Sequence, residues 1–342
     1  MRLLLYSLSI IYSLIITVKN YLFDNGILKS KTHNIPIICI GNLSAGGSGK
    51  TPHTKYIAQL LSKNYKVAIL SRGYGRISSG FNYVNLDSHP TIVGDEPLEI
   101  KINNPYCIVA VNNNRNKAVE KILIDHPEIN IILLDDGLQH RQINAGLNII
   151  VTPFFKPFFK NHLLPLGTLR ESTKESVRAD IIIVSKTPNN TNSTEKKRIL
   201  KGLNLKRHQK AYFSAIKYQK YKSLKNDTEL KNEKEYNITL VTGIANATPL
   251  IQHLKEKAIK FNLIKFADHH NYTEKDIQNI LLTHKKNKSI KKLILTTEKD
   301  AMKLKQFLPI LKQEKVYYVP IDVTINNPEK FKTQLLNYVK NN

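Results

Sequence analysis

The fold is decided by the stretch GNLSAGGSGKTP, residues 41–52. It follows an apolar run, IPIICIG at 35–41, which predicts a short buried strand. It precedes a segment from about 51 to 63 whose apolar residues have helical spacing. A strand, a glycine-rich turn and a helix in this order are the setting that a phosphate-binding loop requires. We therefore expect a nucleotide-binding α/β fold.

The residues of this loop suit phosphate chemistry. Gly46, Gly47 and Gly49 let backbone N–H groups point into one concavity, and the helix N-terminus adds the positive end of its dipole. Lys50 can reach the β- and γ-phosphates, and the Thr51 hydroxyl can bind Mg²⁺. The usual spacing has one more glycine at the start of the loop, where this chain has a serine. The predicted nucleotide-binding residues are Ser44, Ala45, Gly46, Gly47, Ser48, Gly49, Lys50 and Thr51.

Further apolar runs recur through the first half of the chain and alternate with helical segments. They lie at 67–71, 106–111, 129–134, 147–151 and 180–184. Uninterrupted apolar strands of this kind are typical of a parallel sheet that helices cover on both faces. The sequence thus predicts a P-loop NTPase-like, three-layer α/β/α core.

A metal-binding carboxylate is expected at the end of a neighbouring strand. The run INIILLDDG at 129–137 ends in Asp135 and Asp136. These residues would emerge at the carboxyl edge of the sheet, where ligands bind in folds of this class. An acidic tight turn is the alternative, but together with the loop we favour Mg²⁺ binding.

Four other polar motifs are weak when each is taken alone. Taken alone, VGDEP is more often an acidic turn and DHHNY more often a surface histidine pair, while solvated arginines would explain SRGYGR equally well. The four motifs are SRGYGR at 71–76, VGDEP at 93–97, LPLGTLRES at 164–172 and DHHNY at 268–272.

The charge of the chain calls for an anionic partner. The 342 residues carry 52 Lys and Arg against 27 Asp and Glu, a formal charge of +25. Nucleic acid, an acidic membrane surface and a phosphorylated substrate all fit that balance.

The two cysteines, Cys39 and Cys107, exclude a disulfide scaffold and a zinc ribbon, and their apolar surroundings predict buried reduced thiols.

The N-terminus is apolar, with no charged residue from Leu3 to Val18. As a helix these residues are short for a bilayer core of about 30 Å. A weakly polar stripe of Ser9, Ser13 and Thr17 favours a helix that lies in or dips into the membrane interface. A buried helix and a signal peptide remain as alternatives.

The composition divides the chain. Between 186 and 235 there are fourteen Lys or Arg against five Asp or Glu, with few apolar runs, and a second, smaller α/β pattern follows. We expect an N-terminal helix at 1–28, a P-loop core at 29–210, a strand linker at 211–236 and a C-terminal α/β domain at 237–342.

Taken together and in this order, the motifs resemble those of the tetraacyldisaccharide 4′-kinase family, which acts in lipid A biosynthesis in Gram-negative bacteria. The resemblance covers about residues 1–304. The motifs that carry it are GNLSAGGSGKTP, LSRGYGR, GDEP, DDGLQHR, LPLGTLRE, ADIIIVSK, FADHH and TEKDAMKL.

This resemblance implies a membrane-associated transferase that uses ATP and Mg²⁺ to phosphorylate the 4′-hydroxyl of a tetraacylated disaccharide 1-phosphate, giving lipid IVA. It implies that Asp95 is the general base and His269 its partner, and that Arg170 lies near the phosphates. Mg²⁺ would be served by Thr51, Asp135, Asp136 and Glu171. The implied location is the cytoplasmic face of the inner membrane, with a glycolipid substrate and an anionic lipid surface as partners, and neither nucleic acid nor an obligate protein partner is expected.

The chain departs from the family pattern at Leu138, Ser172 and Ala247. None of these changes removes a polar catalytic group, so the activity is not put in doubt.

Two rival interpretations remain. A partner-binding P-loop switch or metallochaperone-like protein would usually carry a guanine-reading N-K-x-D motif or a metal cluster, and this sequence has neither. The missing motif also favours ATP over GTP. A nucleic-acid-dependent ATPase is disfavoured because the basic residues are scattered and the N-terminus is lipid-like.

Overall fold

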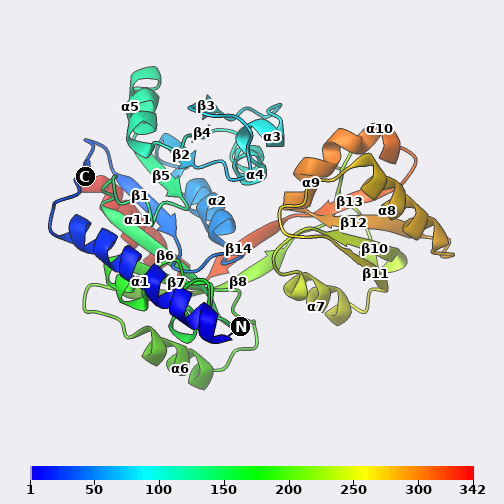
Figure 1. Cartoon of the computed structure of the whole chain (residues 1–342). Coiled ribbons are helices and arrows are strands. Elements are labelled where there is room, and N and C mark those ends of the chain that lie inside the picture. Colours follow the sequence, from blue (N-terminus) through cyan, green and yellow to red (C-terminus); the bar gives the residue numbers. More distant parts are fainter. Residues whose placement is uncertain (1) are drawn as a thin grey trace.

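The computed structural model describes residues 2–342 as a mixed α/β chain with two sheets (Figure 1). The nine-stranded sheet has the order β14-β8-β7-β6-β1-β5-β2-β4-β3, and the five-stranded sheet has the order β11-β10-β12-β13-β9. We call the nine-stranded sheet and the helices packed on it the larger unit. The five-stranded sheet and its helices form the smaller unit.

The bounds of the elements are as follows. The larger sheet consists of β1 (Ile37–Gly41), β2 (Val67–Ser71), β3 (Asn82–Tyr83), β4 (Ile108–Val111), β5 (Ile131–Asp135), β6 (Leu147–Pro153), β7 (Ile181–Ser185), β8 (Lys210–Tyr218) and β14 (Ile321–Ile325). The smaller sheet consists of β9 (Lys222–Ser223), β10 (Asn237–Thr242), β11 (Phe261–Lys265), β12 (Lys292–Thr297) and β13 (Val316–Val319). The helices are α1 (Arg2–Asp24), α2 (Lys50–Leu61), α3 (Pro90–Val93), α4 (Asp95–Asn103), α5 (Arg115–Asp125), α6 (Ser193–Leu203), α7 (Thr248–Glu256), α8 (Glu274–Lys286), α9 (Glu298–Leu304), α10 (Leu308–Leu311) and α11 (Pro328–Lys340).

The larger unit has the predicted three layers. The strands from β8 to β4 in its sheet are parallel, and only the edge strands β14 and β3 run antiparallel. Alternate residues of β1 point to opposite faces, with Ile38 and Ile40 in the core beneath α2 and α11, and Ile37 and Cys39 in the core beneath α5 and α6. This double burial explains the uninterrupted apolar strands, and the predicted fold class is confirmed.

The parallel strands bring the polar motifs to one edge of the larger sheet. The glycine-rich loop connects β1 to α2, and Asp135 is the last residue of the adjacent strand β5. Both therefore lie at the carboxyl edge of the sheet, as expected for a ligand site in this class of fold.

The end of the chain returns to the larger unit. The expected C-terminal domain at 237–342 does not form as one piece, because β14 pairs with β8 and Phe331 and Leu335 of α11 pack into the core beside α2. The sequence gives no sign of this return, since an edge strand that pairs antiparallel has the same apolar pattern in either sheet. The other boundaries stay predictions.

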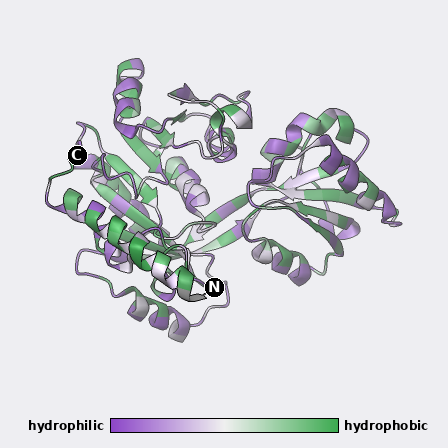
Figure 2. Cartoon of the chain, viewed as in Figure 1, coloured by the Kyte–Doolittle hydropathy of each residue, from purple (hydrophilic) through white to green (hydrophobic). Residues whose placement is uncertain are grey.

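Helix α1 lies along the outside of the larger unit. Ser9 Oγ donates to the Leu163 carbonyl over 3.1 Å, and Tyr12 Oη donates to the Arg170 carbonyl over 2.9 Å. The opposite face is exposed and apolar, and Figure 2 shows hydrophobic residues along most of the helix. By length and composition its segment Leu4–Asp24 could cross a membrane, and only 11% of its most apolar window is buried.

Candidate active site

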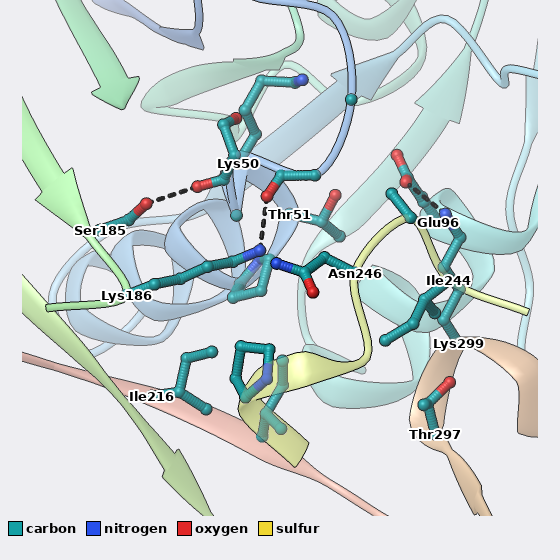
Figure 3. Close-up of a pocket in the computed structure, with 18 of the residues that line it drawn as sticks. Lys50, Thr51, Glu96, Ser185, Lys186, Ile216, Ile244, Asn246, Thr297 and Lys299 are labelled. Atoms are coloured by element: carbon teal, nitrogen blue, oxygen red, sulfur yellow. Dashed lines mark hydrogen bonds and ion pairs between the residues drawn. The ribbon is translucent and has the colours of Figure 1, made fainter. Parts of the chain in front are cut away.

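The glycine-rich loop is held from beneath by side chains of the sheet. Gly49 has a φ of 91°, a conformation that favours glycine, and caps the start of α2. Ser185 Oγ donates to the Ser48 carbonyl over 2.6 Å, and Lys186 Nζ donates to the Gly47 carbonyl over 2.5 Å (Figure 3). The last residue of β7 and the residue after it thus fix two carbonyls of the loop.

A phosphate-binding loop needs its lysine near the acidic end of a neighbouring strand. Lys50 Nζ lies 3.4 Å from Asp136 Oδ1, and Arg170 donates to Asp136 Oδ2 over 3.1 Å. Asp135 accepts from Thr54 Oγ1 over 2.8 Å. The structure therefore brings Lys50, Asp135, Asp136 and Arg170 together, as the motifs predict.

The two aspartates have opposite pKa shifts. Burial and the charges of Glu96 and Asp136 raise the pKa of Asp135 to about 7, against the hydrogen bond from Thr54. Burial would also raise the pKa of Asp136, but Lys50 and Arg170 hold it below its usual range. A divalent cation beside Asp135 would favour its ionised form, so this carboxylate fits a metal ligand.

Glu171 is placed differently from the other predicted metal ligands. Its side chain is buried, and Oε2 accepts from Arg178 over 2.5 Å and from Gln139 over 3.1 Å. Gln139 also accepts from Arg170 over 3.3 Å. Glu171 thus lies in an ionic group that supports Arg170, and its role as a metal ligand remains a prediction.

Asp95 and His269 meet although 174 positions separate them. Asp95 begins α4 of the larger unit, His269 precedes α8 of the smaller unit, and Nδ1 of the ring lies 3.1 Å from Asp95 Oδ2. Burial alone would raise the pKa of Asp95, but the hydrogen bond from His269 and the charges of Lys299 and Lys303 hold it well below its usual range. Asp95 is therefore ionised throughout the neutral range.

A cavity of about 380 Å³ lies where the two units and the strands β8 and β14 meet. The glycine-rich loop and Asp136 line it from one side, and His269 and Lys299 line it from the other. Figure 3 shows Lys186 and Asn246 converging across it from the two units. Its apolar wall comes mainly from Ala215, Ile216, Ile244, Leu250, Val319, Ile321 and Val323. Such a cavity can hold a planar apolar group beside a polyphosphate.

The comparison with protein families decides the identity. A family described as "Tetraacyldisaccharide-1-P 4'-kinase" matches residues 1–340. The chain belongs to this family, LpxK. The match extends the resemblance drawn from the motifs over nearly the whole chain and confirms it.

Relatives of this LpxK family member match it from end to end. The tetraacyldisaccharide 4'-kinase of Bacteroides thetaiotaomicron is 41% identical over 99% of this chain and 93% of the relative. That of Flavobacterium johnsoniae is 37% identical over 100% of this chain and 98% of the relative. A crystal structure of "apo" form LpxK from Aquifex aeolicus in complex with ATP is 29% identical, covers 99% of both chains and has a TM-score of 0.78. None of these proteins is described as a switch or a metallochaperone.

Several residues of the site escaped the sequence analysis. Lys186 enters the prediction only as the last residue of ADIIIVSK, and Lys299 and Lys303 only as residues of TEKDAMKL. The sequence did carry one sign of the pair, since Lys299 and Lys303 are four positions apart and follow an apolar strand, so they would share one face of a helix. Nothing in the sequence says which carboxylates they meet.

Proposed function

We propose that this LpxK family member transfers the γ-phosphate of ATP to the 4′-hydroxyl of a tetraacylated disaccharide 1-phosphate, giving lipid IVA. The observation that carries the proposal is the joining of two sets of groups at one cavity. The loop with Lys50 and Asp136 suits a nucleotide, and the Asp95–His269 pair suits proton transfer from a hydroxyl. A nucleotide switch has no use for the second set.

The loop residues 44–51 would hold the phosphates of ATP, with Lys50 moving from Asp136 to the β- and γ-oxygens. Thr51 and the Asp135–Asp136 pair would hold Mg²⁺, an ion that usually keeps several waters and takes few protein ligands. When bound, the ion would neutralise charge on the phosphates. Arg170, 3.1 Å from Asp136, lies where it can stabilise the same charge.

Asp95, paired with His269, would accept the proton of the acceptor hydroxyl. General-base help of this kind is worth about 10²–10⁴ in rate. Because the pair joins the two units, the base is complete only when they are packed together.

A basic group beside the acidic pair supports an anionic acceptor. Arg115 is 3% exposed, and its Nε and Nη2 have no hydrogen-bond partner within the described part of the chain. Burial lowers its pKa to about 10, while Asp135 and Asp136 oppose this and Arg72 lies close enough to lower it further. A buried guanidinium with free N–H groups suits a phosphate oxygen.

The exposed face of α1 supports a membrane location. It carries Leu4, Leu8, Ile11, Leu14, Ile15 and Val18, all exposed. The same helix is bonded through Tyr12 to Arg170, so a lipid held there would lie near the site. We place the protein at the cytoplasmic face of the inner membrane, where ATP is available and where a charge of +25 favours acidic lipids. A protein partner is not part of this proposal.

The test is a transfer assay with γ-labelled ATP, Mg²⁺ and the disaccharide 1-phosphate lipid in mixed micelles. We expect label in the lipid with the wild type and with Lys63→Ala, an exposed lysine just beyond α2, and none with Lys50→Ala. Label released only as free phosphate by the wild type would overturn the proposal.

A further inference from the structure

Two lysines of α9 face the Asp95–His269 pair from the smaller unit. Lys299 and Lys303 are one helical turn apart and therefore share a face of the helix. That face meets the start of α4, and α4 and α9 lie side by side between the units (Figure 1). Lys303 is 8% exposed, so its charge is not simply solvated.

Lys303 contacts the carboxylate directly. Its Nζ lies 3.1 Å from Asp95 Oδ2 and donates to the His270 carbonyl over 3.2 Å. The other oxygen, Asp95 Oδ1, accepts the Glu96 backbone N–H over 2.9 Å. Together with the histidine, these contacts hold both oxygens in place, with one oxygen bound from α4 and the other from the smaller unit.

Lys299 contacts the far side of the imidazole. Its Nζ lies 2.9 Å from His269 Nε2, 3.1 Å from Glu96 Oε1 and 3.6 Å from Asp268 Oδ1. An ammonium group has three donors and no acceptor, so Nε2 must accept. The ring proton is then on Nδ1, which points to Asp95.

We propose that Lys299 and Lys303 are positioning residues of the phosphoryl transfer, with Lys303 orienting the Asp95 carboxylate and Lys299 fixing the tautomer of His269. This inference rests on the proposed function. In the step itself, the acceptor oxygen forms the new bond to phosphorus, the bond from phosphorus to the bridging oxygen breaks with its electron pair going to ADP, and the hydroxyl proton goes to Asp95. Neither lysine touches the reacting atoms.

The charges around Asp95 explain the expected pH behaviour. The groups facing it are Glu96 on its own helix and His269, Lys299 and Lys303 from the smaller unit. Removal of one ammonium takes away one of the charges that oppose the effect of burial, so the pKa of Asp95 rises from its lowered value. At low pH kcat falls because Asp95 becomes protonated. This acid limb of the pH–rate profile must then move to higher pH.

The experiment compares Lys303→Met, Lys303→Arg and Lys299→Met with Lys305→Met. Lys305 is the matched control, since it is the next lysine along the chain and its ion-pair partner is Asp227 at 4.0 Å. For Lys303→Met we expect kcat to fall at least about tenfold with the KM for ATP nearly unchanged, a rise in the acid limb, and recovery of most of the rate in Lys303→Arg. Lys305→Met should match the wild type.

Lys299→Met tests the tautomer. We expect kcat to fall, and His269→Ala to cost much less in the Lys299→Met background than in the wild type, because the two residues act as one unit. Full kcat and an unmoved acid limb in folded Lys303→Met, or strictly additive effects of Lys299→Met and His269→Ala, would overturn the inference. If Lys303→Met does not fold, Lys303→Gln replaces it and the same outcomes apply. A wild type that labels the lipid keeps the proposed function standing even if these variants are fully active.

Discussion

Two groups of charged side chains join α4 to α9, and their compositions are opposite. In one, the carboxylate of Asp95 has three basic partners, His269, Lys299 and Lys303. In the other, two carboxylates, Glu99 and Glu298, share the single ammonium of Lys55, each at 2.7 Å.

Asp95 and Glu99 lie one turn apart on the same helix, and both are at most 5% exposed, yet their pKa values shift in opposite directions. For Asp95 the basic partners outweigh burial, and the pKa falls. For Glu99, burial and the charge of Glu298 outweigh Lys55, and the pKa rises. Burial raises the pKa of both carboxylates, so the charges around each one decide the difference between them. Environments that push two carboxylates apart in this way are a mark of acid–base sites.

The largest effect on stability is expected from Lys55→Met. It leaves Glu99 and Glu298 buried side by side without a cation, and breaking a buried pair in this way costs about 3–5 kcal/mol. Urea unfolding should show the loss, while Lys63→Met, at an exposed position, should leave the free energy of unfolding unchanged. A stability of Lys55→Met equal to that of the wild type would show that the triad does not hold the two units together.

The pH dependence of stability should separate the two carboxylates. The pKa of Glu99 is raised in the folded protein, so the folded state binds the extra proton and stability falls as the pH rises from 4.5 through the raised value. For Asp95 the pKa is lowered, so its contribution is present above 3.8 and is lost as the pH falls below that value.

The free energy of unfolding of the wild type should fall as the pH rises above 4.5, and Glu99→Gln should make this fall smaller by about 1–3 kcal/mol, at roughly 1.4 kcal/mol per pKa unit. Asp95→Asn should leave that fall unchanged and alter the free energy of unfolding only below pH 3.8. The measurement is the free energy of unfolding from below pH 3.8 up to about pH 8 for the wild type and both variants. Parallel curves for the wild type and Glu99→Gln would contradict the assignment.

The smallest effect is expected when the whole triad is made apolar. Lys55→Met, Glu99→Leu and Glu298→Leu together should restore the stability to within about 1 kcal/mol of the wild type, because no buried charge is left unpaired. The double variant Lys55→Met/Glu99→Leu is the control, since among the described residues it leaves the Glu298 carboxylate with only the Asn103 amide, at 2.9 Å. A triple variant as unstable as this double variant would mean that packing rather than charge holds the contact.

The sequence predicts only part of the group around Asp95, and it does not predict the triad of Lys55, Glu99 and Glu298. The loop at 44–51 and the Asp135–Asp136 pair follow from spacing, because the flanking strands and helix are local. Asp95 and His269 could be named only from the family resemblance.

Their lysine partners, and the triad of Lys55 with Glu99 and Glu298, depend on how α4 meets α9, between residues some 40 to 240 positions apart. Periodicity reports which face of a helix is buried, but it does not say what lies opposite. For the same reason the return of β14 and α11 to the larger unit could not be seen.

The most direct test of the account is the turnover of Asp95→Asn beside that of Glu99→Gln, because Glu99, with its raised pKa and its place at the edge of the cavity, is the rival base. Both variants would be assayed for transfer of label from ATP to the lipid acceptor, at saturating nucleotide and neutral pH. We predict that Asp95→Asn lowers kcat by about 10²–10⁴ and that Glu99→Gln keeps it within a few-fold of the wild type. A collapse of kcat in Glu99→Gln with near-normal turnover in Asp95→Asn would contradict the account.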